Sequence, residues 1–337
     1  MHTYSFVNRA KNIRKEYPIM KKIVIALILA LVMCFSCVSA FAADAWTVTC
    51  PWAPSGVAAM VNQKAAALST TYSDDIILVA TAEKGDAATL NSWSTRVKTG
   101  DKEMIFGNEG LFAITPILDP ERENFTYEDF IYVENLYSAI FVLSANASNG
   151  ITDIPSLKAY LEEGNEISVA TNGATSPEAF LAAAMIGSMG FGDKLYIIPY
   201  ESAAEAAQAA IRGETDLAIS HQSQILEAWQ QGGVNVIAAF DGEDIQQGPF
   251  KGVEGVGKYG YPYFRNRCLI FAKAGTDEAE IAALKALYKD ILTDKEMVEW
   301  MNETMLIEAD LLTEEDVLAH FENVRNIVNE YYDLVAE

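Results

Sequence analysis

Two hydrophobic patterns alternate along the chain. Short apolar runs are followed by longer segments whose apolar residues recur at helical spacing. Residues 196–220 show the pattern most clearly. After an apolar strand, Ser202 stands at a helix start with Glu205 at the capping-box spacing, Gly213 stops the helix, and a second apolar strand follows. This order predicts a β-α-β unit.

The same reading covers the remainder of the chain. It predicts strands at 46–50, 76–80, 103–106, 131–135, 140–144, 167–171, 234–240 and 268–272, and helices at 57–68, 155–163, 176–190, 277–292, 294–305 and 313–335. Residues 117–130 are expected to form a surface loop, and residues 241–263 a Gly- and Pro-rich excursion. Strands that alternate with helices predict an α/β fold with parallel sheets.

Two strand-loop-helix units carry polar or Gly-containing loops. The first loop is Pro51–Gly56; the second is Asn172–Thr175, followed by Ser176 as N-cap and Pro177 at the first helical position. Backbone N–H groups at a helix N-terminus stabilise an anion. In open α/β sheets, ligands lie beyond the carboxyl ends of the strands. One such unit in each lobe would clamp an anion between them, although such turns also occur in α/β proteins where they bind nothing.

The N-terminal segment predicts an export signal. Met20 is followed by two lysines, then by the uncharged residues 23–38 and by Ala40-Phe41-Ala42. A basic, an apolar and a small-x-small region in this order are typical of a cleaved signal peptide. The apolar stretch is shorter than the roughly 20 residues of a membrane span. Residues 1–19 are interpreted as an upstream extension, with Met1 and Met20 both open as the true start.

The charge is strongly acidic. The chain has 24 Lys and Arg and 47 Asp and Glu, a net charge of −23. Residues 1–42 hold six of these basic residues and one of the acidic residues, so the remainder carries −28. Nucleic acid needs a basic footprint, so a nucleic-acid partner is excluded, as is docking on an anionic membrane surface.

The cysteines and histidines leave one question open. Cys50 and Cys268 remain after residue 42, and an oxidising compartment would permit a disulfide between them. Buried free thiols are an equally natural interpretation, because both residues lie in apolar runs. His221 and His320 have no second ligand at metal spacing, so no metal and no cofactor are expected.

Motifs for catalysis fail on inspection. Gly252–Lys258 has phosphate-loop spacing, but Tyr259 replaces the required hydroxyl residue and no helix can follow. Ser220 and His221 are adjacent on a strand, which points their side chains to opposite faces. No catalytic residue is therefore assigned.

Four segments of the sequence are similar, in their order, to motifs of a known protein family. Pro51–Gly56 stands where a Pro-aromatic-x-x-Gly-Gly loop would, and Asn172–Ser176 is similar to a Thr-Gly-x-Gly-Thr loop. Ile198–Ser202 with Gly213–Asp216 matches a Val-Pro-Tyr-x-Gly stretch that precedes a helix and Gly-x-x-Asp. Ala274-Gly275-Thr276 precedes the C-terminal helices. In this order behind a signal peptide, the chain resembles the Bug-type (TctC) solute receptors of tripartite tricarboxylate transporters.

The resemblance implies a fold and a division into domains. The fold is a type II periplasmic binding protein with two lobes, each a mainly parallel sheet flanked by helices, and a cleft between them. Domain 1 would comprise residues 43–146 and 269–337, and domain 2 residues 147–268. The protein would be a periplasmic monomer that captures a small organic acid and delivers it to membrane transporter subunits.

The resemblance also implies a set of ligand-binding residues around that cleft. They are Trp52, Ala53, Pro54, Ser55, Gly56, Asn108, Thr171, Asn172, Gly173, Ala174, Thr175, Tyr200 and Ser220. The sequence departs from the family pattern at Ser55, Ala59, Ala179 and in the turn 85–88. These departures affect the side chains that would select the ligand.

Two other functions stay open from the sequence. A receptor of this kind could signal through a membrane sensor rather than serve a transporter. An exported enzyme on the same scaffold would need an acid, a base or a nucleophile in the cleft, for which Tyr200 and His221 are the candidates.

Overall fold

The computed structural model describes residues 43–52, 54, 56–83, 101–120 and 125–336. The expected signal peptide, the loop residues Ala53 and Ser55 and the turn 85–88 lie outside the described residues. In the part that is described, no helix is long and apolar enough to cross a membrane.

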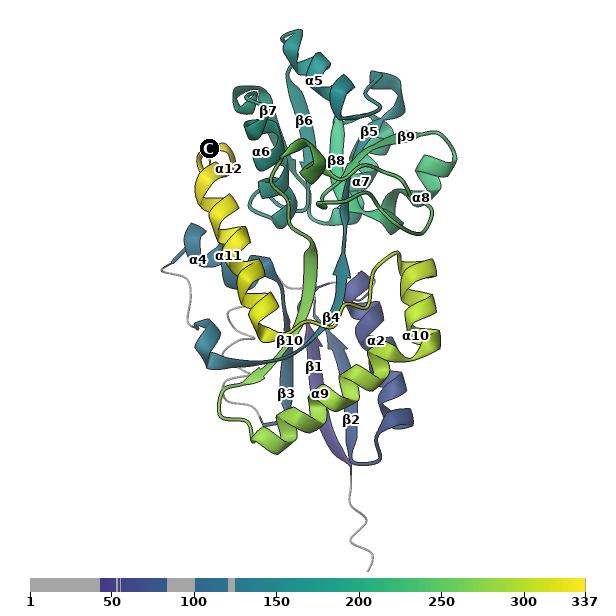
Figure 1. Ribbon diagram of the computed structural model, residues 1–337, viewed down its shortest axis with the longest axis vertical. Helices are drawn as coiled ribbons and strands as arrows, with labels where there is room; N and C mark the ends of the chain where they lie inside the picture. The colour runs from purple at the N-terminus through teal and green to yellow at the C-terminus, as the bar shows by residue number, and fades with distance from the viewer. Residues whose placement is uncertain (1–42, 53, 55, 84–100, 121–124, 337) are drawn as a thin grey trace, which may run out of the picture. The chain divides into compact units, whose positions relative to one another are not determined.

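The first lobe is built on a five-stranded sheet with the order β2-β1-β3-β10-β4 (Figure 1). Its strands are β1 (Asp44–Cys50), β2 (Ile76–Ala82), β3 (Glu103–Gly107), β4 (Phe130–Ala139) and β10 (Asn266–Lys273). Its helices are α2 (Val57–Tyr72), α4 (Thr115–Leu118), α9 (Glu278–Thr293) and α10 (Lys295–Trp300), with π-helical turns at Gly110–Ile114 and Met301–Met305.

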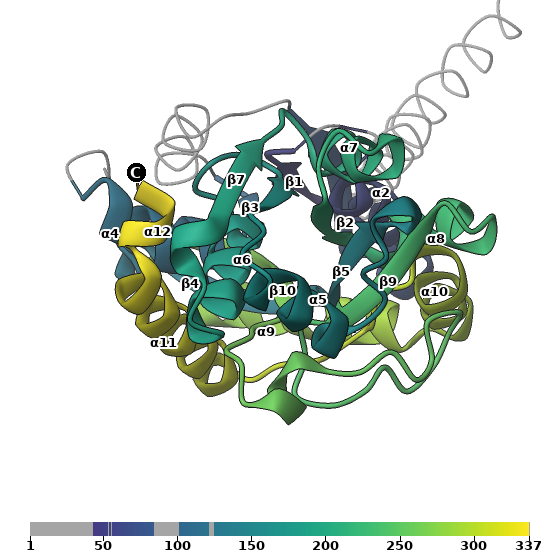
Figure 2. The same cartoon turned by 90° about the horizontal axis from the view of Figure 1, so that it is seen from above.

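The second lobe is built on a five-stranded sheet with the order β7-β6-β8-β5-β9. Figure 2 looks onto this lobe, with the edge strands β7 and β9 on opposite sides. Its strands are β5 (Phe141–Asn146), β6 (Ile167–Thr171), β7 (Leu195–Pro199), β8 (Leu217–His221) and β9 (Val234–Ala239). Its helices are α5 (Ile154–Glu162), α6 (Pro177–Ser188), α7 (Ala203–Arg212) and α8 (Gln222–Gln230).

The expected two-lobe α/β architecture is confirmed, but the sheets are mixed. In the first sheet β10 runs antiparallel to β3 and β4, and in the second β5 runs antiparallel to β8 and β9. The reason lies in the crossing between lobes. β4 passes into β5 through the single residue Ile140, so β5 enters the second sheet from the edge at which β8 ends. A strand that enters from that edge must run against its neighbour. The expected boundary between domains at residues 146 and 147 remains a prediction.

Short-range signals place several elements as expected. The Ser202 hydroxyl accepts a hydrogen bond from the Glu205 N–H at 3.2 Å, and Ser176 caps α6 in the same way. Gly213 ends α7 with a φ of 72°, a conformation that favours glycine. The structure adds α8, which the hydrophobic pattern did not predict. The helix expected at 294–305 is instead α10 followed by a π-helical turn.

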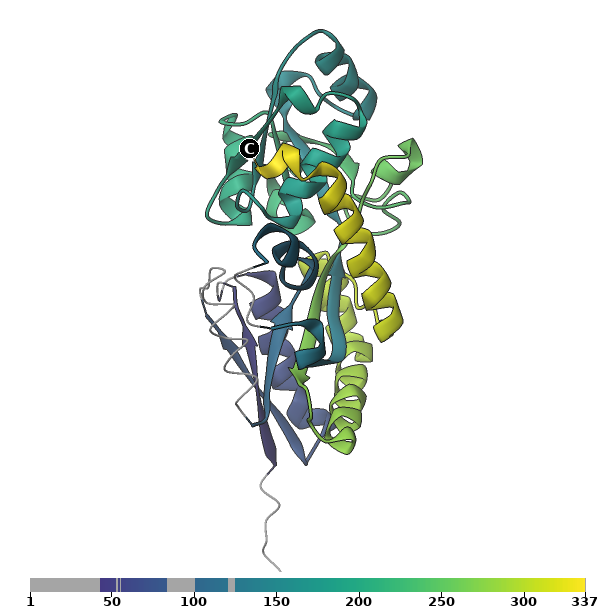
Figure 3. The same ribbon diagram turned by 90° about the vertical axis from the view of Figure 1, so that its left-hand side faces the viewer.

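The C-terminal helices connect the lobes. α11 (Glu314–Tyr331) packs its Phe321 in one hydrophobic cluster with Phe271 of the first lobe and Phe180 of the second. α12 (Asp333–Ala336) follows it onto α6 (Figure 3). A Cβ atom added to Gly187 of α6 would lie 2.9 Å from the side chain of Leu334. The glycine therefore permits the close approach of α12.

The sheet order answers the open question about the cysteines. Cys50 on β1 and Cys268 on β10 are both free and buried. β3 lies between their strands, so two inter-strand spacings, roughly 9–10 Å, separate the two strands. A disulfide needs Cα atoms within about 7 Å. The two residues are therefore buried thiols, and burial raises the pKa of Cys50 to about 12.

Candidate functional site

The strand directions bring the carboxyl ends of both sheets together. In the first sheet β1 runs parallel to β3. β10 is antiparallel to both β3 and β4, so β3 and β4 share one direction. The strands β1, β3 and β4 therefore end at the same edge of the sheet. β4 ends at Ala139, next to the crossing at Ile140. In the second sheet Phe141, where β5 begins, pairs with His221, where β8 ends, and β6 is parallel to both β7 and β8. The ends of all these strands therefore lie on either side of the crossing (Figure 1). We call them the facing edges.

The residues expected from the first lobe follow β1 and β3 at its facing edge. Trp52 is partly buried and packs on the first-lobe core, whereas Pro54 is exposed. Gly56 is the N-cap of α2, with φ −75° and ψ 156° and no side chain to cap the helix. The side-chain oxygen of Asn108 accepts a hydrogen bond from the Leu111 N–H at 3.3 Å. Asn108 thus supports the turn after β3.

The residues expected from the second lobe lie at the other facing edge. Thr171 is fully buried, and its hydroxyl donates to the Gly173 carbonyl at 2.9 Å, while Asn172 is partly buried. Ala174 and Thr175 are exposed at the tip of this loop. The loop therefore has a fixed base and an accessible tip.

Tyr200 and Ser220 are less accessible than the sequence analysis expects of ligand-binding residues. The Tyr200 N–H donates to the Thr171 carbonyl at 2.9 Å, and its ring packs on a cluster of buried alanines from β6, α7 and β8. Ser220 is fully buried, and its hydroxyl has no hydrogen-bond partner. A buried hydroxyl without a partner costs free energy, so this position has unused hydrogen-bonding capacity.

The sequence analysis did not predict a buried acidic side chain at the facing edge of the first lobe. Glu109 comes two residues after β3 ends, and its side chain is fully buried. One carboxylate oxygen accepts from the Asn266 amide at 2.7 Å, and the other accepts from the Arg267 N–H at 3.2 Å. The Nε2 atom of His320, on α11, lies 3.5 Å from the second oxygen. These contacts hold the carboxylate in place at the facing edge of the first lobe.

Two titratable residues of the second lobe sense the charge of Glu109. Glu178, in the first turn of α6, is 4% exposed, and burial with the nearby Glu109 raises its pKa to about 7. His221, at the end of β8, packs its ring on Phe141 with a centroid distance of 4.8 Å. Burial lowers the pKa of His221 to about 4, although Glu109 acts in the opposite direction. Its Nδ1 atom has no hydrogen-bond partner.

Sequence reasoning missed Glu109 and Glu178 because acidic residues are so abundant in this chain. A positional signal was present for both. Glu109 follows Asn108 directly beyond the carboxyl end of a strand, and Glu178 lies in the first turn after the second candidate loop. Strand ends and first helical turns are the places where α/β folds put functional side chains.

The segment that follows the π-helical turn Met301–Met305 lies beside the crossing between the lobes. Ser138 and Glu308 form an isolated antiparallel bridge with two backbone hydrogen bonds of 2.9 Å. Arg265 lies in the segment between β9 and β10, directly before β10. Its guanidinium donates to Asp241 at 2.5 Å and to Glu308 at 2.8 Å. One guanidinium thus joins segments from both lobes, with the planar geometry that favours such pairing.

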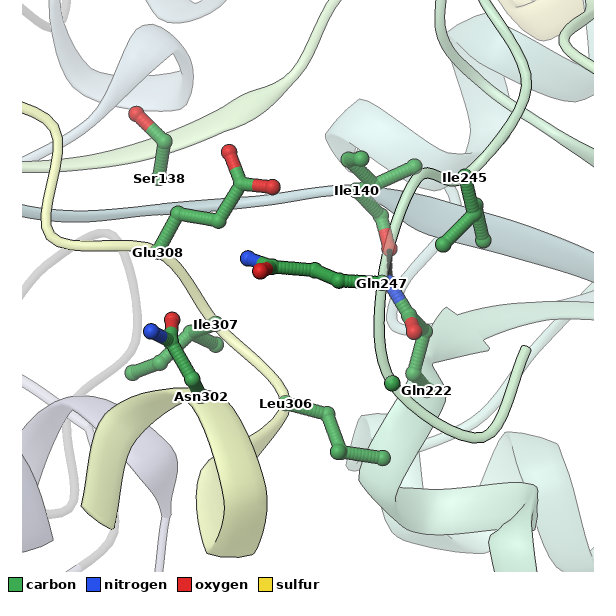
Figure 4. A pocket seen from close by; sticks show the side chains of 10 residues that line it. Ser138, Ile140, Gln222, Ile245, Gln247, Asn302, Leu306, Ile307 and Glu308 are labelled. Atoms are coloured by element: carbon green, nitrogen blue, oxygen red, sulfur yellow. Dashed lines mark hydrogen bonds between the residues drawn. The ribbon is translucent and has the colours of Figure 1, made fainter. Parts of the chain in front are cut away.

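Two cavities lie near this crossing. A pocket of about 30 Å³ is lined in part by Gln247, whose side chain points between Glu308 and Asn302 (Figure 4). That volume is enough for an ordered water. A wider cavity of about 570 Å³ is lined by α11 and by Arg265 and Arg267. Among the described residues, no group of three or more His, Cys, Asp and Glu is placed to hold a metal ion.

No family model and no curated protein matches the sequence. Solved structures do match the fold. A TctC solute binding protein from Polaromonas is 17% identical, with a TM-score of 0.69 over 85% of this chain and 98% of that one. MatC from Rhodopseudomonas palustris with bound malate is 19% identical, with a TM-score of 0.68 over 86% and 98%. R. palustris Rpa4515 with adipate is 15% identical, with a TM-score of 0.71 over 86% and 97%.

At these identities the likeness establishes the fold. It is the fold of two-lobe periplasmic solute-binding proteins. Within that class it is the fold of the TctC-type receptors, as the order of the loops in the sequence indicated.

Proposed function

We propose that this protein is an extracytoplasmic receptor that captures a small organic acid between its lobes and delivers it to a tripartite tricarboxylate-type transporter. The observation that carries the proposal is the pair of facing edges, each with a strand-loop-helix unit whose helix begins there. Two solved structures with this fold hold malate and adipate. An export signal at residues 20–42 would place the protein in the periplasm, and we expect it to act as a monomer.

The amino end of α2 is the stronger anion donor of the two. Its first turn contains no acidic residue, and its N-cap Gly56 has no side chain that could occupy the free N–H groups. A ligand carboxylate would accept from these N–H groups and be stabilised by the helix dipole. At α6 the Ser176 hydroxyl already accepts from the Ala179 N–H at 3.2 Å. The loop at Asn172–Thr175 would then contribute the remaining polar contacts.

The net charge of the protein makes this local geometry necessary. A charge of −28 outside residues 1–42 repels an anion at long range. Salt screens that repulsion beyond about 10 Å, whereas hydrogen bonds act at contact. Capture therefore depends on donors that touch the ligand, and removing access to them should abolish binding.

The substitution Gly56→Val tests the α2 end. The backbone of Gly56 is in an extended conformation that any residue adopts, so valine brings no backbone strain. Its side chain would instead block the approach of the ligand to the α2 N–H groups. Calorimetry with malate, adipate and hexanoate, next to glucose and ethanolamine, measures binding, and the melting temperature reports folding. We expect at least one acid to bind wild type and none to bind Gly56→Val.

The exposed Glu201, beside Tyr200 in the second lobe, provides the control. Glu201→Ala should bind the acid as wild type does. If Gly56→Val binds normally, the α2 end is not the donor. If glucose or ethanolamine binds while no acid does, the proposed ligand class is wrong.

An enzymatic role receives no comparable support. Glu109 and His320 are one pair of titratable side chains near the facing edges, with 3.5 Å between carboxylate oxygen and Nε2. The Glu109 side chain is fully buried, and the His320 side chain is 6% exposed where it lines the wider cavity of about 570 Å³. Ser220 and His221 lie on consecutive strand positions and pair with Val142 and Phe141, so they do not form a nucleophile and its base.

A further inference from the structure

The cavity of about 570 Å³ lies on the side of the first sheet that α11 covers. Its lining comes from the segment between β9 and β10 with the start of β10, from residues 310–312 and from the first half of α11. Phe321 of α11 clusters with Phe271 of β10, whereas Ala58 of α2 clusters with Ile270. Neighbouring residues of a strand point to opposite faces, so α11 and α2 cover opposite faces of this sheet. The cavity, which we call the α11 cavity, is therefore separate from the amino end of α2.

Part of the lining of the α11 cavity is apolar and open to solvent. Phe264 is buried, Leu312 is partly buried, and Leu311 and Ala319 are exposed. A ligand with an apolar part would remove this surface from water, which favours binding. The volume lies within the range of pockets that hold small molecules.

Arg267, at the start of β10, is a cation of the α11 cavity with unused hydrogen-bond donors. Its Nε and Nη1 atoms are buried, and within the described residues they have no hydrogen-bond partner. The other guanidinium of the cavity differs, because Arg265 donates to Asp241 and to Glu308. A buried donor without an acceptor costs free energy. A ligand carboxylate beside Arg267 would supply the acceptor that this side chain lacks.

The acidic side chains of the α11 cavity also differ from one another. Asp241 forms an ion pair with Arg265. Asp310 and Asp316 line the same cavity, and in the part of the chain that the structure describes neither is paired with Lys or Arg. One cation and two carboxylates thus remain without an ion-pair partner.

The hydrogen bonds of Asp310 and Asp316 leave each of them able to accept another. Asp310 accepts at Oδ2 from the Ser138 hydroxyl at 3.0 Å. Asp316 accepts at Oδ2 from the Thr313 N–H at 2.9 Å and from its hydroxyl at 2.6 Å. These hydrogen bonds and, to a lesser degree, the charge of Arg267 hold the pKa of Asp316 below its ordinary value, so it is charged at neutral pH. In each carboxylate these bonds do not use Oδ1.

This combination of groups selects a ligand that carries both charges. A simple anion would contact Arg267 but be repelled by the two carboxylates, and a simple cation would leave Arg267 without an acceptor. We propose that the α11 cavity is a second ligand site, which takes an α-amino acid with an apolar side chain. The ligand carboxylate accepts from Arg267, and the ligand ammonium donates to Asp310 and Asp316. Its apolar side chain packs on Leu311 and Leu312.

The net charge of the protein permits such a ligand. The charge of −28 outside residues 1–42 repels an organic acid at long range, whereas it exerts little net force on a zwitterion. The α11 cavity also has an apolar part, which favours leucine over glycine. This second site does not depend on the function proposed for the facing edges.

Calorimetry with three ligands of the same carbon skeleton tests the ligand class. Leucine has both charged groups, 4-methylpentanoate lacks the ammonium, and 3-methylbutylamine lacks the carboxylate. Leucine should bind wild type at one site, and each of the other two should bind at least about tenfold more weakly, because each loses hydrogen bonds to charged groups. If leucine does not bind, or if 4-methylpentanoate binds as tightly as leucine, the inference is wrong.

Two variants test the residues. Arg267→Gln removes the guanidinium, and Asp316→Asn removes the charge while keeping an oxygen that can accept from Thr313. Each should weaken leucine binding by about tenfold or more. The matched control is Arg212→Gln, because Arg212 is an exposed arginine of α7 outside the cavity, and it should bind leucine as wild type does. Melting temperatures measured alongside report folding, and normal leucine binding by folded Arg267→Gln would refute the site.

Gly56→Val separates this site from the one at the facing edges. We expect this variant to lose the organic acid but to bind leucine as wild type does. If Gly56→Val loses leucine, the amino acid binds at the amino end of α2 and the α11 cavity is not its site. If leucine binds as expected while no organic acid binds wild type, the function proposed for the facing edges fails and this inference stands.

Discussion

The two perturbed side chains at the lobe boundary should act on stability with opposite signs. The unfolded chain binds a proton at His221 below pH 6.5, whereas burial keeps the folded histidine neutral down to about pH 4. The unfolded state binds more protons in this window, so His221 lowers stability as pH falls. Glu178 keeps its proton in the folded protein up to about pH 7 and loses it at 4.5 when unfolded. It therefore lowers stability as pH rises.

The two magnitudes are similar. The interval from 6.5 to about 4 for His221 and the interval from 4.5 to about 7 for Glu178 each correspond to about 3 kcal/mol. In wild type the two contributions largely cancel between about pH 4.5 and pH 6.5. In a variant that lacks one of the two groups, the pH dependence of stability that comes from the other should become measurable.

The perturbation is His221→Phe, which keeps an aromatic ring against Phe141 and removes the titration. Urea unfolding at intervals between about pH 4 and pH 8 gives the free energy of unfolding of each variant. The stability of His221→Phe relative to wild type should rise by about 3 kcal/mol as pH falls from 7 to 4.

Glu178→Gln should give the mirror image. Its stability relative to wild type should rise by about 3 kcal/mol as pH increases from 4.5 to about 7.5. Each difference curve cancels the titration of all other groups, so it reports one side chain. If either curve is constant within about 0.5 kcal/mol, the burial assigned to that side chain does not control its proton, and the reasoning fails.

Three further predictions follow from the contacts between elements. Arg265→Ala leaves two carboxylates, one from each lobe, without their shared partner. Urea unfolding should show a free energy of unfolding lower by about 2–3 kcal/mol, and Arg265→Lys should recover part of that loss. A loss below about 0.5 kcal/mol would contradict the pairing. Gly187→Val should displace Leu334 and expose the C-terminal turn to proteolysis without preventing folding; unchanged cleavage would show that the contact is dispensable. A thiol assay of protein without residues 1–42 should find Cys50 and Cys268 reduced after denaturation and unreactive before it; a loss of both thiols would indicate a disulfide.

Much of the fold could be predicted because its signals are local. The strand expected at 167–171 is β6 to the residue, and α7 begins and ends where Ser202 and Gly213 predicted. Caps, turns and hydrophobic periodicity act over a few residues, so they are visible in one sequence. The nine-residue α8 was missed because its alternating polar residues, including Gln222 and Gln224, present little apolar periodicity.

The candidate site was only partly predictable. The loops at Pro51–Gly56 and Asn172–Thr175 were recognised from their order and from the helices that follow them. Their side-chain environments were not, because burial depends on what packs against a residue from elsewhere in the chain. Ser220, for example, is fully buried with an unpartnered hydroxyl, and its contact with a ligand stays a prediction.

The sequence by itself determined the order of most strands and helices, the acidic charge and the two loops proposed to hold the anion, since each depends on neighbours in the chain. Only the tertiary structure decided the directions of β5 and β10, the separation of the cysteines and the proximity of Glu109 to Glu178 and to His221. The physical reason is that a pKa, like a cavity or a strand direction, is set by distance in space. The crossing at Ile140 brings carboxyl ends from both lobes together, and no local pattern records which side chains meet there.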